Sequence, residues 1–322
     1  LPPSGGHNPR DEVPSTLTPT ERVNYKKELK HMGYKETYKD WLSWADDETK
    51  KELSALHDEK EIEDRFYRDL EFGTAGLRGI MGAGTNRMNR YTVARATKGL
   101  SEYLKALYPG ELSRGLVIAY DSRNHSREFA VEAAAVLTAS GIPVKIFKEL
   151  EPIPVLSFSV RHFHALGGIV ITASHNPPEY NGYKVYGEDG GQLVPKKADV
   201  LTEYVEKEKD LSAIDHRTRE DLITWLGEDV VDLFIDTIFK ESRYHGNPPP
   251  LKVVYTPLHG SGRVPVEKIL GKAGFRDLLI VKEQEMPDGD FPTCEYPNPE
   301  ERAALQAGID KCRSWKEMGK PF

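Results

Sequence analysis

Cysteine is scarce in this chain of 322 residues, which contains only Cys294 and Cys312. One such pair provides no disulfide framework. The spacings of zinc sites, such as Cys-x-x-Cys or a Cys/His cluster, are also missing. The sequence therefore indicates a reducing compartment, and we expect a cytoplasmic location.

Long apolar runs and excess positive charge are also missing. No run approaches the ~20 apolar residues that a membrane-spanning helix needs, so we expect no membrane partner. The formal net charge of -7 argues against nucleic-acid binding and requires any phosphate site to be local. Residues 1–22, LPPSGGHNPRDEVPSTLTPTER, lack the apolar core of a signal peptide and are typical of a flexible leader.

The pattern of apolar residues predicts an α/β fold. Residues 20–65 are charged and helix-prone, with Trp41, Leu42, Trp44 and Leu53 as apolar anchors. After them, buried strands alternate with helices at the spacing of right-handed βαβ units. The expected strands are 115–120, 144–147 and 168–172. The expected helices are 91–107, 127–140, 155–164, 196–209 and 221–243. Asn89 would begin the first of these, and Ser126 would cap the second.

A second α/β unit is expected after the proline-rich linker at residues 246–250. Its expected strands are 251–255 and 278–282, its expected helix is 264–273, and another helix should follow Asn298-Pro299-Glu300-Glu301. We therefore predict mixed, mostly parallel sheets sandwiched by helices. The expected division is a leader with a helical extension (1–65), a first domain (66–245) and an incomplete second domain (251–322).

Residues 167–186, GGIVITASHNPPEYNGYKVY, are the most informative stretch. Their apolar, β-branched start predicts a strand buried on both faces. Pro177 and Pro178 then exclude a helix, which leaves Ser174 on a stiff loop at the carboxyl end of a strand, where open α/β sheets bind ligands. We expect Asn181-Gly182 to turn the chain. A hydroxyl, the His175 imidazole and the Lys184 ammonium group would then share one short loop.

A glycine-rich segment, Gly73-Thr74-Ala75-Gly76-Leu77-Arg78-Gly79, precedes this stretch. Its glycines would allow close backbone approach and direct the Arg78 guanidinium at a ligand. A plain glycine turn with a solvated arginine explains the same residues equally well. The segment alone does not decide between these interpretations.

Two common chemistries fit these motifs poorly. Ser174 lies between Ala173 and His175, so it lacks the Gly-x-Ser-x-Gly elbow of a serine hydrolase. No Walker loop occurs, and neither GTAGLRG nor GAGTNRMN follows a strand into a helix as a dinucleotide fingerprint would. Asp288-Gly289-Asp290 could suggest a cation site, but it lacks a third acid, and we interpret it as an ordinary surface loop.

Phosphoryl transfer fits better, because a phosphorylated serine needs cations and hydrogen-bond donors around its oxygens. Arg78, His175, Lys184 and the loop amides can supply them. Lys184 could also exchange a proton with a sugar hydroxyl if burial and neighbouring charge lower its pKa.

Five motifs, in this order, make the sequence resemble the α-D-phosphohexomutase superfamily. They are FGTAGLRG (72–79), TASHNPPEYNGYK (172–184), GGQL (190–193), TPLHG (256–260) and PNPE (297–300). The similarity extends from about residue 38 to 310. GAGTNRMN and YNGYKVYGEDGGQL are most similar to the phosphoglucomutase type 2 and phosphopentomutase branch.

The resemblance implies a four-domain isomerase that uses Mg²⁺ and a phosphorylated Ser174, with glucose 1,6-bisphosphate as activator. Sugar 1-phosphate and 6-phosphate, or 5-phosphate for pentoses, would interconvert through a bisphosphate. The implied catalytic residues are Ser174, His175, Lys184 and Arg78, and Asn176 joins them in substrate binding. Mg²⁺ would touch a phosphoryl oxygen on Ser174. His259 has a weaker claim, since it could equally order its own loop.

The sequence also departs from the family pattern. The expected metal loop, Asp-x-Asp-x-Asp-Arg, does not follow PNPE, and the sugar and phosphate loops of domains 3 and 4 are missing. We therefore expect this chain to be inactive by itself. A glucose 1,6-bisphosphate synthase shares every motif present, and a non-catalytic form with exposed Val253, Val254 and Leu279 is a further alternative.

Overall fold

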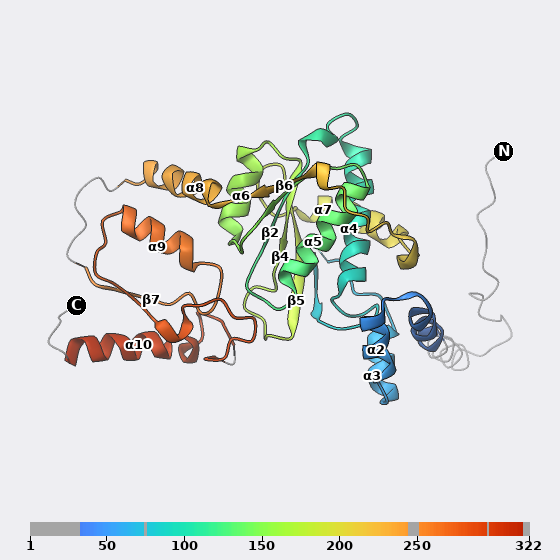
Figure 1. The fold of residues 1–322 in the computed structure, drawn as a ribbon, viewed down its shortest axis with the longest axis horizontal. Helices are drawn as coiled ribbons and strands as arrows, with labels where there is room; N and C mark the ends of the chain where they lie inside the picture. Colours follow the sequence, from blue (N-terminus) through green and yellow to red (C-terminus); the bar gives the residue numbers. More distant parts are fainter. Residues whose placement is uncertain (1–32, 74–75, 244–250, 295, 318–322) are drawn as a thin grey trace. The chain divides into compact units, whose positions relative to one another are not determined.

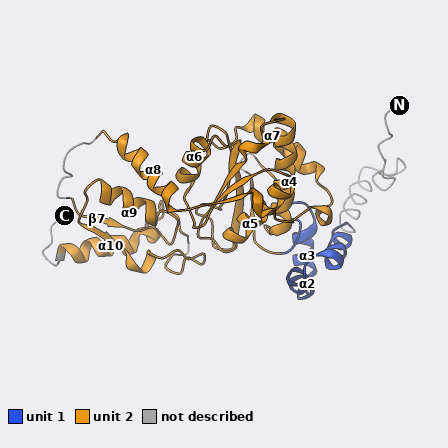
Figure 2. Ribbon diagram, turned by 45° about the horizontal axis from the view of Figure 1, so that its top comes forward, with its two compact units in different colours: residues 1–69, 83–86 blue, residues 70–82, 87–322 orange. Residues whose placement is uncertain are grey.

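The computed structural model describes residues 33–73, 76–243, 251–294 and 296–317 (Figure 1). The chain forms two compact units, one of residues 1–69 and 83–86, the other of residues 70–82 and 87–322 (Figure 2). The predicted leader and the linker at 246–250 lie outside the described residues. In the described part of the chain, no helix is long and apolar enough to cross a membrane.

The smaller unit is helical, as predicted. Residues 33–44 form a helix, followed by α2 (Asp47–Ser54) and α3 (Glu59–Phe66). An aspartate begins each of the last two, and the Asp46 carboxylate accepts a 2.8 Å hydrogen bond from the Thr49 amide. Trp41 packs edge-on against Phe66, with ring centroids 5.5 Å apart. The predicted anchors Trp41 and Leu53 are buried.

The larger unit contains a six-stranded sheet with the order β1-β5-β4-β2-β3-β6. Neighbours among β4, β2, β3 and β6 are parallel, whereas β5 runs antiparallel to both β4 and β1. The mixed, mostly parallel sheet is therefore confirmed. The strands are β1 (Leu77–Ile80), β2 (Leu116–Tyr120), β3 (Val144–Phe147), β4 (Gly167–Ile171), β5 (Tyr180–Gly187) and β6 (Ile223–Leu226).

Helices cover both faces of this sheet (Figure 1). One face carries α4 (Arg90–Leu107), α5 (Ser126–Ala139) and α7 (Pro195–Lys207), and the other carries α6 (Ile153–His162) and α8 (Glu228–Lys240). Residues of β2 alternate between the two cores: Ile118 packs into the first and Val117 into the second. This double burial explains why the central strands are continuous apolar runs. Asn89 begins α4 with the predicted cap, here a full capping box.

Three local predictions were wrong. Asn181 and Gly182 lie within β5, where each is hydrogen-bonded or packed against neighbouring strands, instead of forming a turn. The single helix expected at 221–243 is β6 followed by α8, since Gly227 separates a strand from the helix. Ser126 is the first residue of α5 rather than its cap, and its hydroxyl donates to the Asp121 carboxylate at 2.8 Å.

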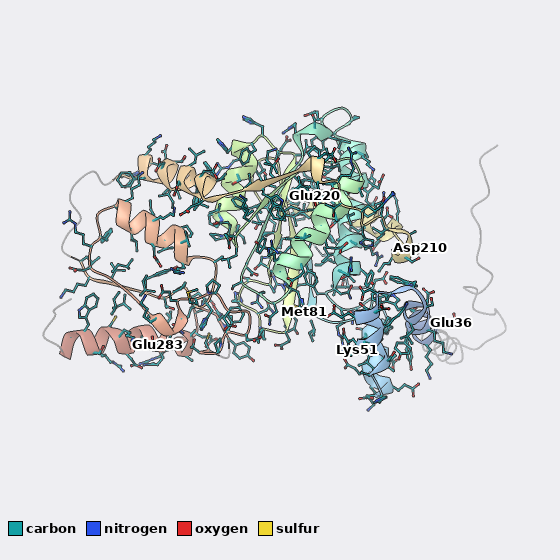
Figure 3. The ribbon with its side chains drawn as sticks, in the orientation of Figure 1. Glu36, Lys51, Met81, Asp210, Glu220 and Glu283 are labelled. Carbon is teal, nitrogen blue, oxygen red and sulfur yellow. The ribbon has the colours of Figure 1, made fainter. Side chains whose placement is uncertain are left out.

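Residues 251–317 contain a second, two-stranded parallel sheet, β7 (Val253–Tyr255) with β8 (Leu278–Ile280). Helices α9 (Arg263–Lys272) and α10 (Arg302–Glu317) accompany it, and Glu283 forms a 3.0 Å ion pair with Lys311 of α10 (Figure 3). Val253, Val254 and Leu279 are half-buried. The short 3-10 helices are η1 (Leu112–Arg114), η2 (Leu211–Ala213), η3 (Glu220–Leu222) and η4 (Lys282–Gln284).

Candidate active site

Ser174 lies just beyond the carboxyl end of β4, as the sequence predicts. Its φ is 59°, in the left-handed region that non-glycine residues seldom occupy. Its amide donates to the Thr172 hydroxyl at 2.9 Å, and its exposed Oγ lies 3.4 Å from Nδ1 of His175. Such backbone strain persists only where the surroundings hold it.

Arg123 provides that support. Its guanidinium is buried and donates four hydrogen bonds to backbone carbonyls of the Ser174 loop. The Nη1 atom reaches the carbonyl oxygens of Pro177 (2.9 Å) and Tyr180 (3.0 Å), while Nη2 reaches those of Ser174 (2.9 Å) and Asn176 (2.5 Å). The planar fork of arginine is suited to bridging several acceptors at fixed angles. We name residues 173–180 the serine loop.

Asp121 balances the buried charge of Arg123. It follows β2, beside β4 in the sheet, and its Oδ2 lies 3.7 Å from Nε of Arg123. Its Oδ1 accepts from the Arg123 amide at 3.1 Å and from Oγ of Ser126. Asn181 of β5 then donates to Ser126 Oγ at 3.0 Å. Burial raises the pKa of Asp121, so this carboxyl is costly to ionise unless its partners remain in place.

Arg78 and Lys184 approach the serine loop from two neighbouring strands. In β1, Arg78 pairs with Gly182 of β5, and in β5 Lys184 pairs with Val170 of β4. Nη1 of Arg78 donates to the Asn176 side chain at 3.2 Å. The sheet order therefore brings an arginine, a lysine and the serine loop to one region.

The glycines around Arg78 allow the strands to approach closely. A side chain at Gly76, whose φ is 100°, would collide with the backbone carbonyl of Tyr183. A Cβ at Gly182 would lie 2.6 Å from the carbonyl oxygen of Thr172. The glycine-rich segment therefore packs closely against strand β5. The sequence left a plain turn open at this segment, but residues 77–80 are a strand, and residues 74–75 lie outside the described part of the chain.

The pKa of Lys184 is lowered, first by burial of the ammonium group and then by the positive charge of Arg78. Asp121 opposes the shift. A lysine with a depressed pKa gives up and takes back a proton more readily near neutral pH. The predicted proton-transfer role of Lys184 requires such a lowered pKa.

Ser174 and His175 line a cavity of about 550 Å³. Asp121 and Glu151 also line it, whereas Arg78 and Lys184 do not. Glu151 is 6% exposed, and within the described residues its Oε2 atom has no hydrogen-bond partner. Burial raises the pKa of Glu151 to about 8, which favours the protonated, neutral form of this carboxyl at neutral pH.

His259 is held by hydrogen bonds to both ring nitrogens. Nδ1 lies 2.9 Å from the carbonyl oxygen of Met286, and Nε2 lies 2.9 Å from the Thr293 hydroxyl. The ring is buried. This geometry favours the interpretation of His259 as a residue that orders its own loop.

The residues described here do not form a Mg²⁺ site. Within residues 33–73, 76–243, 251–294 and 296–317, no three His, Cys, Asp or Glu side chains gather to hold a metal ion. Hard cations need several oxygen ligands, and the Asp121 carboxylate in the cavity is occupied by Arg123 and Ser126. Binding of Mg²⁺ through a phosphoryl group on Ser174 stays a prediction.

The sequence predicted some site residues and missed others. The structure brings Ser174, His175, Asn176 and Arg78 together, and Lys184 of β5 is close enough to Arg78 for the two charges to interact. Sequence reasoning did not select Arg123 or Glu151. Asp121-Ser122-Arg123 directly follows a buried strand parallel to β4, and this position at the carboxyl edge of the sheet is the signal that could have found Arg123.

Comparison with protein families assigns the serine loop and most strands of the two sheets to known domains. Residues 69–212 match the α/β/α domain I of phosphoglucomutase/phosphomannomutase, and residues 232–319 match domain II of the same family. The chain belongs to the α-D-phosphohexomutase superfamily.

Curated relatives carry phosphomutase names. The chain is 34% identical over 284 residues to the phosphopentomutase of Mus musculus, covering 81% of this chain and 45% of the relative. It is 35% identical over 277 residues to the phosphoglucomutase of Staphylococcus haemolyticus, covering 84% and 50%. The chain thus spans about half the length of these relatives.

Solved structures support the fold alone. A protein of Thermus thermophilus assigned as a phosphomannomutase superposes with a TM-score of 0.64 at 23% identity, covering 76% of this chain and 52% of that one. A phosphoglucomutase/phosphomannomutase family protein of Burkholderia thailandensis gives 0.59 at 22% identity, covering 76% and 50%.

Proposed function

We propose that this chain carries the phosphoryl-accepting part of a sugar phosphate mutase acting on a phosphorylated hexose or pentose. Ser174 is the phosphoryl acceptor, and Arg78, His175 and Asn176 bind phosphoryl oxygens. The observation that carries the proposal is the serine loop: an exposed hydroxyl at the end of β4, on a strained backbone that Arg123 fixes through four carbonyls. The names of the relatives support the same class of reaction.

The reaction consists of two balanced transfers. In the first, the bond between phosphorus and Ser174 Oγ breaks while a sugar hydroxyl oxygen forms a bond to phosphorus, and the proton of that hydroxyl passes to neutral Lys184. Ser174 Oγ takes a proton from solvent. In the second, Ser174 Oγ returns that proton to solvent as it bonds to the other phosphoryl group of the bisphosphate, and the sugar oxygen that leaves takes its proton from protonated Lys184. Covalent storage on serine divides one isomerisation into two in-line transfers.

Each residue has a task that suits its environment. Arg78 offers charged donors to phosphoryl oxygens, where charge accumulates during transfer. Lys184 exchanges the sugar proton, for which its lowered pKa is suited. Glucose 1,6-bisphosphate serves as the phosphoryl donor that primes Ser174. The alternative activity of a bisphosphate synthase differs in releasing the bisphosphate, so the product detected separates the two.

Intact mass of the purified chain tests the proposal. After incubation with glucose 1,6-bisphosphate and Mg²⁺, we expect one phosphate per chain, located on Ser174 by peptide mapping. Ser174→Ala should abolish the increase. Ser122→Ala is the matched control, because Ser122 lines the same cavity, and it should still be phosphorylated.

A phosphate on another residue, or none on Ser174 in a chain that melts cooperatively, would overturn the proposal. Repeating the incubation with ribose 1,5-bisphosphate compares hexose and pentose donors. Whichever donor loads Ser174 faster identifies the preferred sugar.

A further inference from the structure

Residues 288–291, Asp288-Gly289-Asp290-Phe291, contact the segment that follows β2. Gly289 is buried, and a Cβ there would lie 2.5 Å from the backbone nitrogen of Asn124, so only glycine fits. The Asn124 amide donates to the Asp290 carboxylate at 2.7 Å. The interpretation of this segment as an ordinary surface loop was therefore incomplete. Asp290 is exposed, but Gly289 is packed against Asn124.

Phe291 extends the contact to Arg123. The Arg123 guanidinium lies over the Phe291 ring, 5.2 Å from its centroid. Phe291 is buried, has a φ of 48°, and lines the same cavity as Ser174. A left-handed backbone at a bulky residue is unfavourable and persists only when its surroundings hold it. The ring is thus held over the cation that holds the serine loop.

Arg123 connects this ring to the nucleophile. The central carbon of the guanidinium lies over the Phe291 ring, and its two terminal nitrogens donate to the carbonyls of Ser174, Asn176, Pro177 and Tyr180. A desolvated cation over an aromatic face is attracted to it and loses freedom to reorient. Any change at Phe291 is therefore passed to four backbone contacts of the serine loop.

We propose that residues 288–291 are a positioning segment that fixes the serine loop through Phe291 and Arg123. Neither residue needs to touch the substrate, so both act on Ser174 through the backbone of its loop. The effect on phosphoryl transfer rests on the proposed function. The effect on the loop does not, because it follows from the contacts alone.

The test compares Phe291→Leu with Phe291→Tyr in the full chain, using hydrogen exchange of loop peptides followed by mass spectrometry. Leucine preserves an apolar side chain but removes the ring, so the backbone amides of residues 173–176 and 179–180 should exchange about tenfold faster. Tyrosine restores an aromatic face and should restore slow exchange. Phe163→Leu is the matched control, because Lys145 lies over that ring at 5.5 Å, and it should leave the serine loop unchanged.

A second readout links the segment to chemistry. Phe291→Leu should slow phosphate uptake on Ser174 from glucose 1,6-bisphosphate by about tenfold, and Phe291→Tyr should recover it. Should the wild-type chain accept no phosphate, the proposed function fails, and the exchange experiment still decides the positioning role.

Local unfolding of residues 251–317 would show as faster exchange in α9 peptides. Asn124→Ala distinguishes local unfolding from a positioning role, because it removes the hydrogen bond to Asp290 without changing any residue of 251–317. It should also accelerate exchange in the serine loop, with α9 unchanged. Unchanged loop exchange in both Phe291→Leu and Asn124→Ala would overturn the proposal.

Discussion

Two loops of this protein start alike and end differently. Thr172 after β4 accepts a hydrogen bond from the Ser174 amide at 2.9 Å, and Thr256 after β7 accepts one from the Leu258 amide at 3.1 Å. Both loops then enter the left-handed region, at Ser174 (φ 59°) and at Leu258 (φ 50°), which His259 follows with a φ of 58°. The same backbone device therefore follows a strand in each sheet.

The histidines of the two loops have opposite environments. His175 is exposed, next to the Ser174 hydroxyl, whereas His259 is buried with a partner at each ring nitrogen. A group whose hydrogen bonds are all satisfied inside the protein contributes to stability and is not available to a ligand. The serine loop therefore leaves its histidine accessible to a ligand, whereas the loop after β7 uses its histidine in hydrogen bonds within the protein.

The largest effect is expected at Arg123, which holds the first loop. Arg123→Ala removes the buried cation beside Asp121 and the side-chain donor to four loop carbonyls, and should lower the free energy of unfolding by about 3–5 kcal/mol. Urea unfolding measures this loss. Arg217→Ala is the control, because its ion pair with Asp215 is exposed, and it should cause no measurable change. A small loss for Arg123→Ala would show that the loop is held by other contacts.

The buried acid near the first loop should make stability depend on pH. Burial raises the pKa of Glu151 to about 8 from 4.5, so the folded chain binds a proton that the unfolded chain releases. Stability should therefore fall by several kcal/mol between pH 4.5 and 8, and level off above. The nearby charges are Lys268, which opposes the shift, and Glu149 and Glu228, which add to it.

Glu151→Gln should remove this slope and raise the melting temperature at pH 9. Thermal unfolding of both proteins across pH 5–9 measures it. Glu149→Gln is the control, since it removes a neighbouring charge but leaves Glu151 buried. Parallel curves for wild type and Glu151→Gln would contradict a buried neutral acid.

Substitution of the two histidines tests whether the serine loop and the loop after β7 differ as described. His259→Ala should leave the Met286 carbonyl without its partner and the Thr293 hydroxyl with Gln284 alone, and cost about 1–3 kcal/mol of stability. His175→Ala should leave stability nearly unchanged and slow phosphate uptake on Ser174. Chemical unfolding and intact mass measure both properties on both variants. Equal stability losses would remove the distinction between the loops.

The smallest effect concerns the backbone of the serine itself. Because Ser174 has a φ of 59°, Ser174→Gly should relieve strain and raise the free energy of unfolding by about 1 kcal/mol. The same change abolishes phosphate uptake. Ser122→Gly is the control, since Ser122 has no positive φ, and should be neutral or slightly destabilising. No gain for Ser174→Gly would mean that the turn is unstrained.

The sequence predicted the central strands and most helices because buried parallel strands and amphipathic helices leave periodic patterns. It failed where contacts distant in sequence decide the structure. Asn181-Gly182 has the composition of a turn, but pairing with β1 and β4 extends it into β5. The helix-like run at 221–243 contains β6, which pairs with β3.

The site shows the same limit. Motif chemistry nominated Ser174, His175, Lys184 and Arg78 as candidate site residues, since each lies in a distinctive local pattern, and their roles stay predictions. Arg123 acts on backbone atoms more than 50 positions away, and no local pattern records such contacts. Phe291 is more distant still, and only the packing of its ring on Arg123 shows its role.

The most direct test of the account is the pH dependence of phosphate uptake on Ser174 in wild type and Lys184→Arg. Lys184 has a lowered pKa, and in the proposed uptake from the bisphosphate its ammonium would give a proton to the sugar oxygen that leaves. The wild-type rate should therefore fall as pH rises through that pKa. Arginine retains the charge but does not release a proton, so Lys184→Arg should be at least about 100-fold slower and lose the alkaline fall. A variant with the wild-type rate and profile would contradict a shared site of Ser174 and Lys184.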